Sequence, residues 1–203
     1  MAKKQYIYGF IEGDFGAGKT GFLAYMGLSF YKRYHKVYSN FKLDVPNGVY
    51  LDNLTGAKLL SLNKERKDCL MLLHESYNWF DKREWAKKEN KRILDAIFQI
   101  RKLNIDIFCD IPLLRYMDGR SKMHSTHYYR ATGEQKLINN EEIEGTGIYE
   151  YFKMMYDIRA DIFYPVGLPF YLPLWKIYNK YDTFERQRQG QITLADNFLQ
   201  IPE

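Results

Sequence analysis

Short apolar runs along this chain alternate with longer segments in which apolar residues recur at helical spacing. Residues 6–11 and 105–111 are rich in β-branched and aromatic side chains, as expected for strands buried in a parallel sheet. Residues 21–32 carry Phe22, Leu23, Met26 and Phe30 at helical spacing, and residues 82–103 predict a long helix with Ile93, Ile97 and Ile100 facing the sheet. This alternation predicts an α/β fold with a mainly parallel central sheet flanked by helices.

Two further strands and a short helix complete the expected N-terminal half. The strands are predicted at residues 36–39 and 68–75, and the helix at 53–62. The order of strand 68–75, long helix and strand 105–111 predicts a right-handed parallel crossover. We therefore expect the carboxyl ends of these strands to meet at one edge of the sheet, facing the loop that follows residues 6–11.

The last third of the chain changes character. Residues 126–131, 147–158, 162–163 and 175–181 are rich in Tyr and Phe and predict short strands that extend the sheet in antiparallel fashion. These tyrosines suit either stacking on nucleic acid or packing in an aromatic core, and we favour packing.

We expect one domain, with a nucleotide-binding core at 1–125 and an antiparallel extension with a tail at 126–203. The polar tail 183–203 is expected to fold back or to mediate subunit contact.

Composition supports this picture. With 203 residues, 46% of them apolar, the chain can bury one substantial core. The two cysteines, Cys69 and Cys109, lie in apolar strand-like runs, which favours buried thiols over a disulfide or a zinc site. The N-terminus runs directly into the first strand without a recognisable signal peptide, and the longest apolar run, 162–175, is too short and too interrupted by Pro and Gly to span a membrane. We therefore expect a soluble protein without stable transmembrane insertion.

Charge adds a candidate partner. The net charge is +5 and the pI is near 9.0, which is compatible with a polyanion. Lysines and arginines crowd between residues 82 and 122, so this middle third is the best candidate for a nucleic-acid face. Any single cluster is more often a solvated helix face.

The strongest chemical signal is the stretch from Gly13 to Thr20, which has the pattern GxxxxGKT between a predicted strand and a predicted helix. Its glycines allow left-handed backbone angles, so that N–H groups and the helix N-terminus converge on a phosphate. Lys19 is expected to reach the β- and γ-phosphates, and the Thr20 hydroxyl to bind Mg²⁺. The predicted nucleotide-contacting residues are Gly13, Asp14, Phe15, Gly16, Ala17, Gly18, Lys19, Thr20 and Gly21.

The strand at 68–75 ends in His74 and Glu75, where a nucleotide site needs a metal-binding acid and a water-polarising base. Glu75 is the candidate base. His74 either supports the site or caps the strand, because an imidazole is a poor ligand for Mg²⁺. If His74 does not bind the metal, either Thr20, the phosphates and water hold it alone, or a carboxylate from another segment takes the place of the missing acid. Asp110, at the end of strand 105–111, could orient water, complete the metal site or hydrogen-bond the following loop.

Three arginines before and after the strand at 105–111 are candidates for a residue that acts on the site of a neighbouring subunit, as in ring-forming ATPases. They are Arg101, Arg115 and Arg120, and the sequence does not rank them.

Together these motifs resemble the FtsK–HerA superfamily of DNA-pumping P-loop ATPases, and more closely the genome-packaging NTPases of turreted icosahedral archaeal viruses. The residues that carry the resemblance are the loop at 13–20, the strands at 37–40 and 70–75, the helix end at 99–102 and the late segment 181–183. Only the loop is highly specific. The pattern departs from the family at His74, where Asp is usual, and at Asp110, where many members have a polar amide. This leaves open whether Gln99, Asp110 or neither senses the γ-phosphate.

The resemblance implies a RecA-like motor that forms a homo-oligomeric ring around double-stranded DNA. It would hydrolyse ATP with Mg²⁺ to drive DNA into a capsid, docked at a capsid or internal-membrane vertex, in the host cytoplasm and in association with the virion. Two alternatives remain open. A small-molecule P-loop kinase shares the loop and would work at full rate as a monomer, and a nucleotide-gated assembly protein would hydrolyse negligibly.

Overall fold

The computed structural model describes residues 6–52, 54–64, 66–76, 88–139 and 142–182. The strands are β1 (Tyr8–Glu12), β2 (Lys36–Ser39), β3 (Lys42–Leu43), β4 (Gly48–Tyr50), β5 (Cys69–Leu73), β6 (Ile105–Ile111), β7 (His127–Asn139), β8 (Glu142–Asp157), β9 (Ile162–Pro165), β10 (Phe170–Pro173) and β11 (Tyr181–Asp182). The helices are α1 (Lys19–Phe30), α2 (Gly56–Ser61), α4 (Lys88–Ile100) and α5 (Gly119–His124), with 3-10 turns η1 (Tyr31–Arg33), η2 (Arg101–Leu103), η3 (Leu114–Tyr116) and η4 (Leu174–Lys180).

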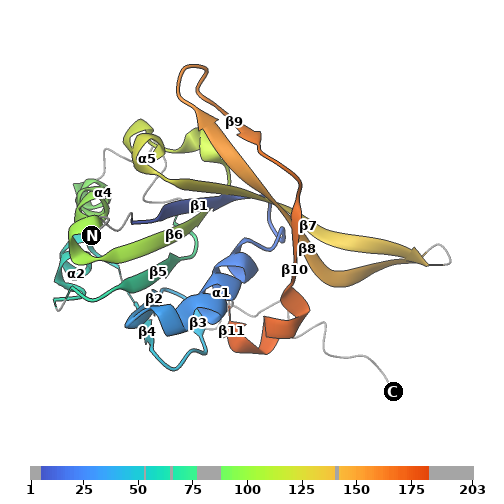
Figure 1. Ribbon diagram of the computed structural model, residues 1–203, viewed down its shortest axis with the longest axis horizontal. Coiled ribbons are helices and arrows are strands. Elements are labelled where there is room, and N and C mark those ends of the chain that lie inside the picture. Colours follow the sequence, from blue (N-terminus) through green and yellow to red (C-terminus); the bar gives the residue numbers. More distant parts are fainter. Residues whose placement is uncertain (1–5, 53, 65, 77–87, 140–141, 183–203) are drawn as a thin grey trace.

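In the described part of the chain, nine strands form one sheet in the order β10-β8-β7-β1-β6-β5-β2-β4, with β9 also paired to β8. The pairs from β7 through β1, β6, β5 and β2 to β4 are parallel, and β8, β9 and β10 extend the sheet in antiparallel fashion. The predicted fold class, a RecA-like mainly parallel sheet with an antiparallel C-terminal extension, is confirmed. Figure 1 shows the β7–β8 hairpin projecting away from the body.

Helices cover both faces of the sheet (Figure 1). On one face α1 contributes buried Phe22 and Leu23, which pack with Leu70 and Phe108 of the strands. On the other face α2 and α4 contribute Leu59, Ile93 and Ile97 against Met71 and Ile107. Consecutive strand residues alternate between these two clusters because side chains of a strand point to opposite faces. The three-layer arrangement fixes the carboxyl ends of β1, β5 and β6 at one edge of the sheet.

Most predicted elements are confirmed, with small changes of bounds. The strands predicted at 36–39 and 105–111 match β2 and β6, and the predicted long helix is present as α4 and η2, although residues 82–87 and the side chain of Ile100 lie outside the described part. Cys69 and Cys109 are fully buried thiols outside any disulfide, as predicted. The tail 183–203 lies outside the described residues. Among the residues described, every helix is too short or too polar to cross a membrane.

The strand predicted at 175–181 is wrong. Residues 174–180 form the 3-10 helix η4, which places Leu174 and Ile177 against the α1 side of the sheet, whereas Tyr181 begins strand β11. A spacing of three residues puts Leu174 and Ile177 on one face of a 3-10 helix, and their packing outweighs the strand propensity of the aromatic residues. Strand β10, which precedes η4, was not predicted, because its flanking prolines read as strand breakers.

Candidate active site

The loop between β1 and α1 has the shape of a phosphate cradle. Gly16 (φ 75°) and Gly18 (φ 89°) have left-handed backbone angles, as predicted for this loop. Gly18 is also the N-cap of α1, so the first N–H groups of the helix have no capping side chain and point toward the loop. Phe15 is fully exposed at the tip. Uncapped N–H donors and the positive end of a helix make a binding site for an anion.

Lys19 is folded over this loop. Its Nζ donates hydrogen bonds to the carbonyl oxygens of Gly13 (2.7 Å) and Asp14 (2.8 Å). Burial lowers the pKa of Lys19, while the nearby carboxylates of Asp110, Asp14 and Glu75 act in the opposite direction and favour its charged form. A partly desolvated cation beside uncapped N–H donors is suited to the charge of a polyphosphate.

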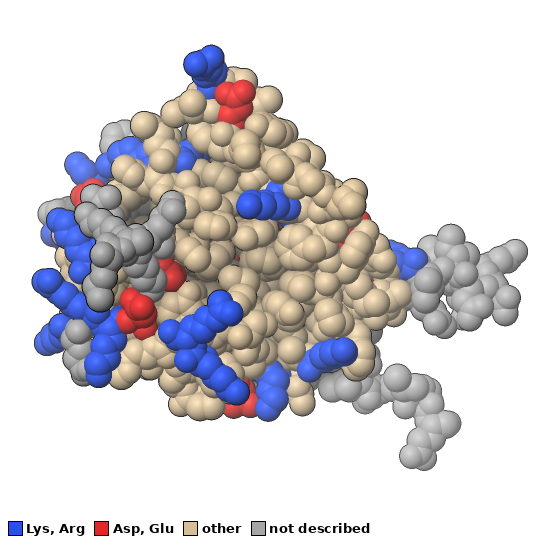
Figure 2. Space-filling view, viewed as in Figure 1, with Lys and Arg blue, Asp and Glu red and all other residues tan. Residues whose placement is uncertain are grey.

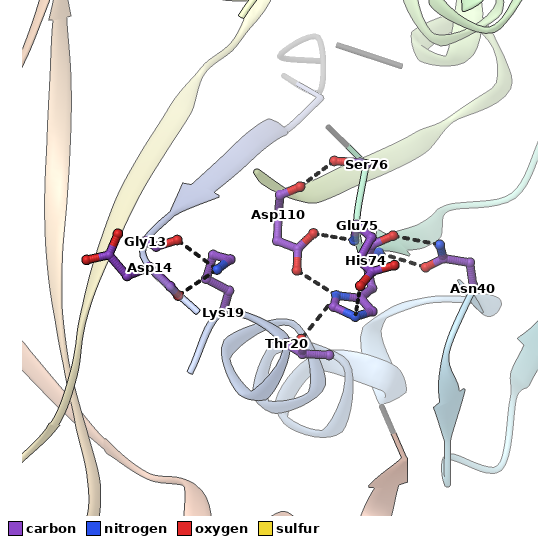
Figure 3. A network of polar contacts seen from close by, with 9 residues as sticks. All are labelled: Gly13, Asp14, Lys19, Thr20, Asn40, His74, Glu75, Ser76 and Asp110. Carbon is purple, nitrogen blue, oxygen red and sulfur yellow. Dashed lines mark hydrogen bonds and ion pairs between the residues drawn. The ribbon is translucent and has the colours of Figure 1, made fainter. Parts of the chain in front are cut away.

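The ends of β5 and β6 bring three further residues to the loop (Figure 3). The strands are parallel with Leu73 beside Cys109, so His74, which follows β5, lies next to Asp110 near the end of β6. Nδ1 of His74 lies 2.7 Å from Oδ2 of Asp110 and 3.1 Å from Oγ1 of Thr20. Nδ1 carries at most one proton, and the Asp110 carboxylate is the stronger acceptor, so we assign a proton on Nδ1 directed at Asp110. His74 therefore hydrogen-bonds a nearly fully buried carboxylate, and the Thr20 hydroxyl lies beside the same ring nitrogen.

Glu75 is held by its backbone, and its carboxylate is partly exposed. Its N–H donates to Oδ1 of Asp110 (2.5 Å), and its φ of 52° is in the left-handed region that non-glycine residues seldom adopt. The side chain is 40% exposed, and Oε1 lies 3.8 Å from Nε2 of His74. The backbone is fixed while the carboxylate reaches solvent at the loop, which suits a group that orients a water molecule.

Sequence reasoning missed two supporting residues, Asn40 and Ser76. Buried Asn40 accepts a hydrogen bond from His74 N (2.7 Å) and donates one to His74 O (2.8 Å), so its amide holds the backbone of His74 at both polar groups. Ser76 donates to the carbonyl oxygen of Asp110 (2.5 Å). Asn40 directly follows strand β2, so a polar residue at the end of a core strand was the available signal.

The side chains at this edge can be compared with the Mg²⁺ ligands predicted from the sequence. The Thr20 hydroxyl and the Asp110 carboxylate supply hard oxygen donors, which fit Mg²⁺. The His74 imidazole between them does not. The residues that would hold Mg²⁺ are therefore Thr20 and Asp110, alongside the phosphates themselves.

Replacing His74 with aspartate is expected to tighten Mg²⁺ binding. The new carboxylate adds negative charge beside Asp110 and an oxygen donor beside Thr20, so we expect the Mg²⁺ concentration for half-maximal nucleotide binding to fall about tenfold. A fluorescent ATP analogue titrated at several Mg²⁺ concentrations measures this. His35→Asp, on the exposed approach to β2, is the matched control. An unchanged Mg²⁺ requirement in His74→Asp would show that this strand end does not face the metal.

The remaining candidate residues, three arginines and a glutamine, lie at opposite ends of β6. Arg115 and Arg120 follow the carboxyl end of β6 and are exposed. Gln99 and Arg101 precede the opposite end of β6, about 20 Å from Asp110 along a seven-residue strand. The structure therefore brings Asp110 to the loop within the same subunit and does not bring Gln99 there. The backbone of Arg101 lies at that distant end, and its side chain is outside the described part.

Comparisons with known proteins give one local sequence match and a likeness of fold. No family model matches the chain. The Gene 1 protein of Escherichia phage If1 is 36% identical over 59 residues, which cover 29% of this chain and 17% of that protein. The chain therefore matches only a small part of that relative.

Two solved structures have a similar fold. The N-terminal domain of zonular occludens toxin from Neisseria meningitidis has a TM-score of 0.56 at 16% identity, covering 88% of this chain and all of that one. The genome packaging NTPase B204 from Sulfolobus turreted icosahedral virus 2, in complex with ATP-gammaS, has a TM-score of 0.52 at 10% identity, covering 80% of this chain and 97% of that one. At these identities the likeness shows the fold, which is that of P-loop NTPases. B204 belongs to the viral packaging NTPases that the sequence motifs resemble.

Proposed function

We propose that this protein hydrolyses ATP with Mg²⁺ and uses the energy to move double-stranded DNA as a ring of identical subunits. The observation that carries the first part is the convergence of a phosphate cradle, Lys19, Glu75 and buried Asp110 at one edge of the sheet. The second part is supported by the fold shared with a genome packaging NTPase.

Each residue has a separate role in this proposal. The loop N–H groups and Lys19 hold the β- and γ-phosphates. Glu75 orients the attacking water and accepts its proton, while Asp110 fixes the backbone of Glu75 and the ring of His74. Mg²⁺, when bound by Thr20 and Asp110, supplies positive charge that neutralises the transferred phosphoryl group. Preorganised hydrogen bonds account for the strained backbone at Glu75.

Arg115 is the residue that we propose to act on a neighbouring subunit. Arg120 is engaged with Asp118 (3.3 Å) and Asp95 (3.9 Å). Arg115 is exposed; it lies over the ring of Tyr116 at 4.9 Å and donates a hydrogen bond to the Tyr116 hydroxyl (3.2 Å), and such exposed contacts with an uncharged neighbour break at little cost. An arginine that reaches across an interface must be able to leave its resting contact, which favours Arg115.

The charge distribution supports a DNA partner. Figure 2 shows Lys and Arg gathered on the side of the molecule that carries α2, α4 and β4 in Figure 1, whereas few charges lie over β8 and β10. A face rich in Lys and Arg is suited to the phosphates of DNA.

In the packaging role we propose that the ring docks at a capsid or membrane vertex in the host cytoplasm and associates with the virion. A nucleotide-gated assembly protein is the second candidate function, because His74 occupies the strand end where a metal-binding acid is usual.

Mass measurement and DNA binding test the proposal together. We expect ATP-gammaS to convert monomers into one closed oligomer, and a labelled 40-base-pair duplex to bind that oligomer with an affinity that falls by about 10³-fold or more between 50 and 200 mM salt, as for proteins with many phosphate contacts. A monomer that ignores DNA and phosphorylates a small acceptor at full rate would instead identify a kinase. An oligomer that forms with ATP but turns over negligibly would identify an assembly protein.

A further inference from the structure

A row of aromatic side chains begins at the phosphate loop and runs away from it. The hydroxyl of Tyr151 donates to the carbonyl oxygen of Gly18 (2.9 Å), and a Cβ at Gly18 would lie 2.5 Å from a ring carbon of Tyr149. Tyr149 and Tyr151 are two residues apart on β8 and therefore share one face of the sheet. The loop glycine is thus packed directly against two tyrosine side chains.

The row continues onto η4, which follows β10 and lies next to α1 (Figure 1). The hydroxyl of Tyr178 donates to that of Tyr149 (3.5 Å). Trp175 packs on Gly147, which precedes Tyr149 by two residues on β8: a Cβ at Gly147 would lie 2.7 Å from the Trp175 Cβ. Two aromatic residues of η4 therefore extend the row that Tyr149 starts.

The row lies on the side of the loop toward which the nucleoside of a bound triphosphate extends. In the sheet, β6 and β5 lie on one side of β1, and β7 and β8 lie on the other. Glu75 follows β5 and Asp110 lies near the carboxyl end of β6, so a γ-phosphate that they act on lies on that side of the loop. Because the three phosphates form a chain across the loop, the nucleoside extends toward the opposite side, where β8 and η4 lie.

The aromatic side chains of the row differ in how much of their surface is exposed. Tyr151 is fully buried and serves the core. Trp175 is 55% exposed and Tyr178 is 47% exposed, although both are anchored at one end by the contacts above. Aromatic side chains that are fixed in place and keep an exposed surface are suited to stacking on a nucleobase, since every base has a π-face.

We propose that Trp175 and Tyr178 form the nucleobase subsite of the nucleotide site, with the base of a nucleoside triphosphate stacked on one or both rings. This inference rests on the proposed nucleotide binding and adds the group that recognises the nucleoside. It also explains the position of η4, because Leu174 packs on α1 at Gly21 and thereby holds the two aromatic residues beside the helix that carries Lys19.

The test compares ATP with inorganic tripolyphosphate, both with Mg²⁺, by calorimetry on the full chain. Trp175→Ala and Tyr178→Ala are each expected to weaken ATP binding by about tenfold to a hundredfold, the usual range for a lost base–aromatic stack, and to leave tripolyphosphate binding within about twofold. Trp175→Phe should restore most of the loss. Tyr171→Ala is the matched control, because Tyr171 is an exposed tyrosine of β10 that hydrogen-bonds Glu150.

Lys19→Ala distinguishes this inference from the function on which it rests, because it should weaken both ligands. If Lys19→Ala weakens neither, the phosphate site itself is wrong. If it weakens both while Trp175→Ala and Tyr178→Ala leave ATP unchanged, the nucleobase subsite is overturned. Should the alanine variants fail to fold, the wild-type chain still decides: equal affinity for ATP and tripolyphosphate would overturn the subsite.

Discussion

ATP hydrolysis is expected to fall by about 10²- to 10³-fold when Lys19 is replaced with alanine, and nucleotide binding is expected to weaken with it. Lys19 is the cation of the loop, and its Nζ is held over the cradle by the carbonyl oxygens of Gly13 and Asp14. Because burial lowers its pKa in the free protein, a bound phosphate is the partner that best compensates its charge. Phosphate release from ATP and calorimetric ATP binding measure the two effects.

Lys36→Ala is the matched control for this variant, because Lys36 is an exposed lysine at the end of β2 remote from the site. It should leave hydrolysis and melting temperature unchanged. Hydrolysis that survives in Lys19→Ala at the wild-type rate would show that the loop is a structural turn and not the site of turnover.

Replacing Glu75 with glutamine is expected to separate binding from turnover. Glutamine keeps the size of the side chain and the backbone contact from Glu75 N to Asp110, but it cannot accept a proton from water. We expect ATP to bind within a few-fold of the wild-type affinity and single-turnover hydrolysis to slow by about 10²- to 10⁴-fold. Quenched-flow measurement of phosphate from enzyme-bound ATP gives the rate of this step.

Glu150→Gln is the corresponding control, since Glu150 is a carboxylate of β8 that hydrogen-bonds Thr132 and Tyr171. Its hydrolysis rate should match that of the wild type. If Glu75→Gln abolished ATP binding but left bound ATP to turn over normally, Glu75 would not be the base.

The fold could be predicted where burial leaves a clear pattern in the sequence. Strand β5 is apolar on both faces because helices cover both sides, so it stands out as a continuous apolar run. The β7–β8 hairpin extends well beyond the predicted segments, because its outer part has two strands and lies away from the body, where burial imposes no alternation. Strand β10 was missed because Pro173 is tolerated at the end of an edge strand.

The site could be predicted where a local motif carries it. The loop at 13–20 is contiguous in sequence, and its glycine angles agree with the prediction. The contacts of Asn40 and Ser76 could not be predicted, because the polar atoms that they meet come together only through the parallel order of β2, β5 and β6. The same applies to the aromatic row at Gly18, which joins the loop to residues more than a hundred positions later.

The ATPase rate per subunit decides whether this protein is a nucleotide-driven motor that works on DNA as an oligomer. The rate is measured across protein concentrations, with and without double-stranded DNA. We expect a rate that rises with protein concentration as the ring assembles and rises again when duplex DNA is added. A measurable rate that is indifferent to both protein concentration and DNA would contradict the proposed motor.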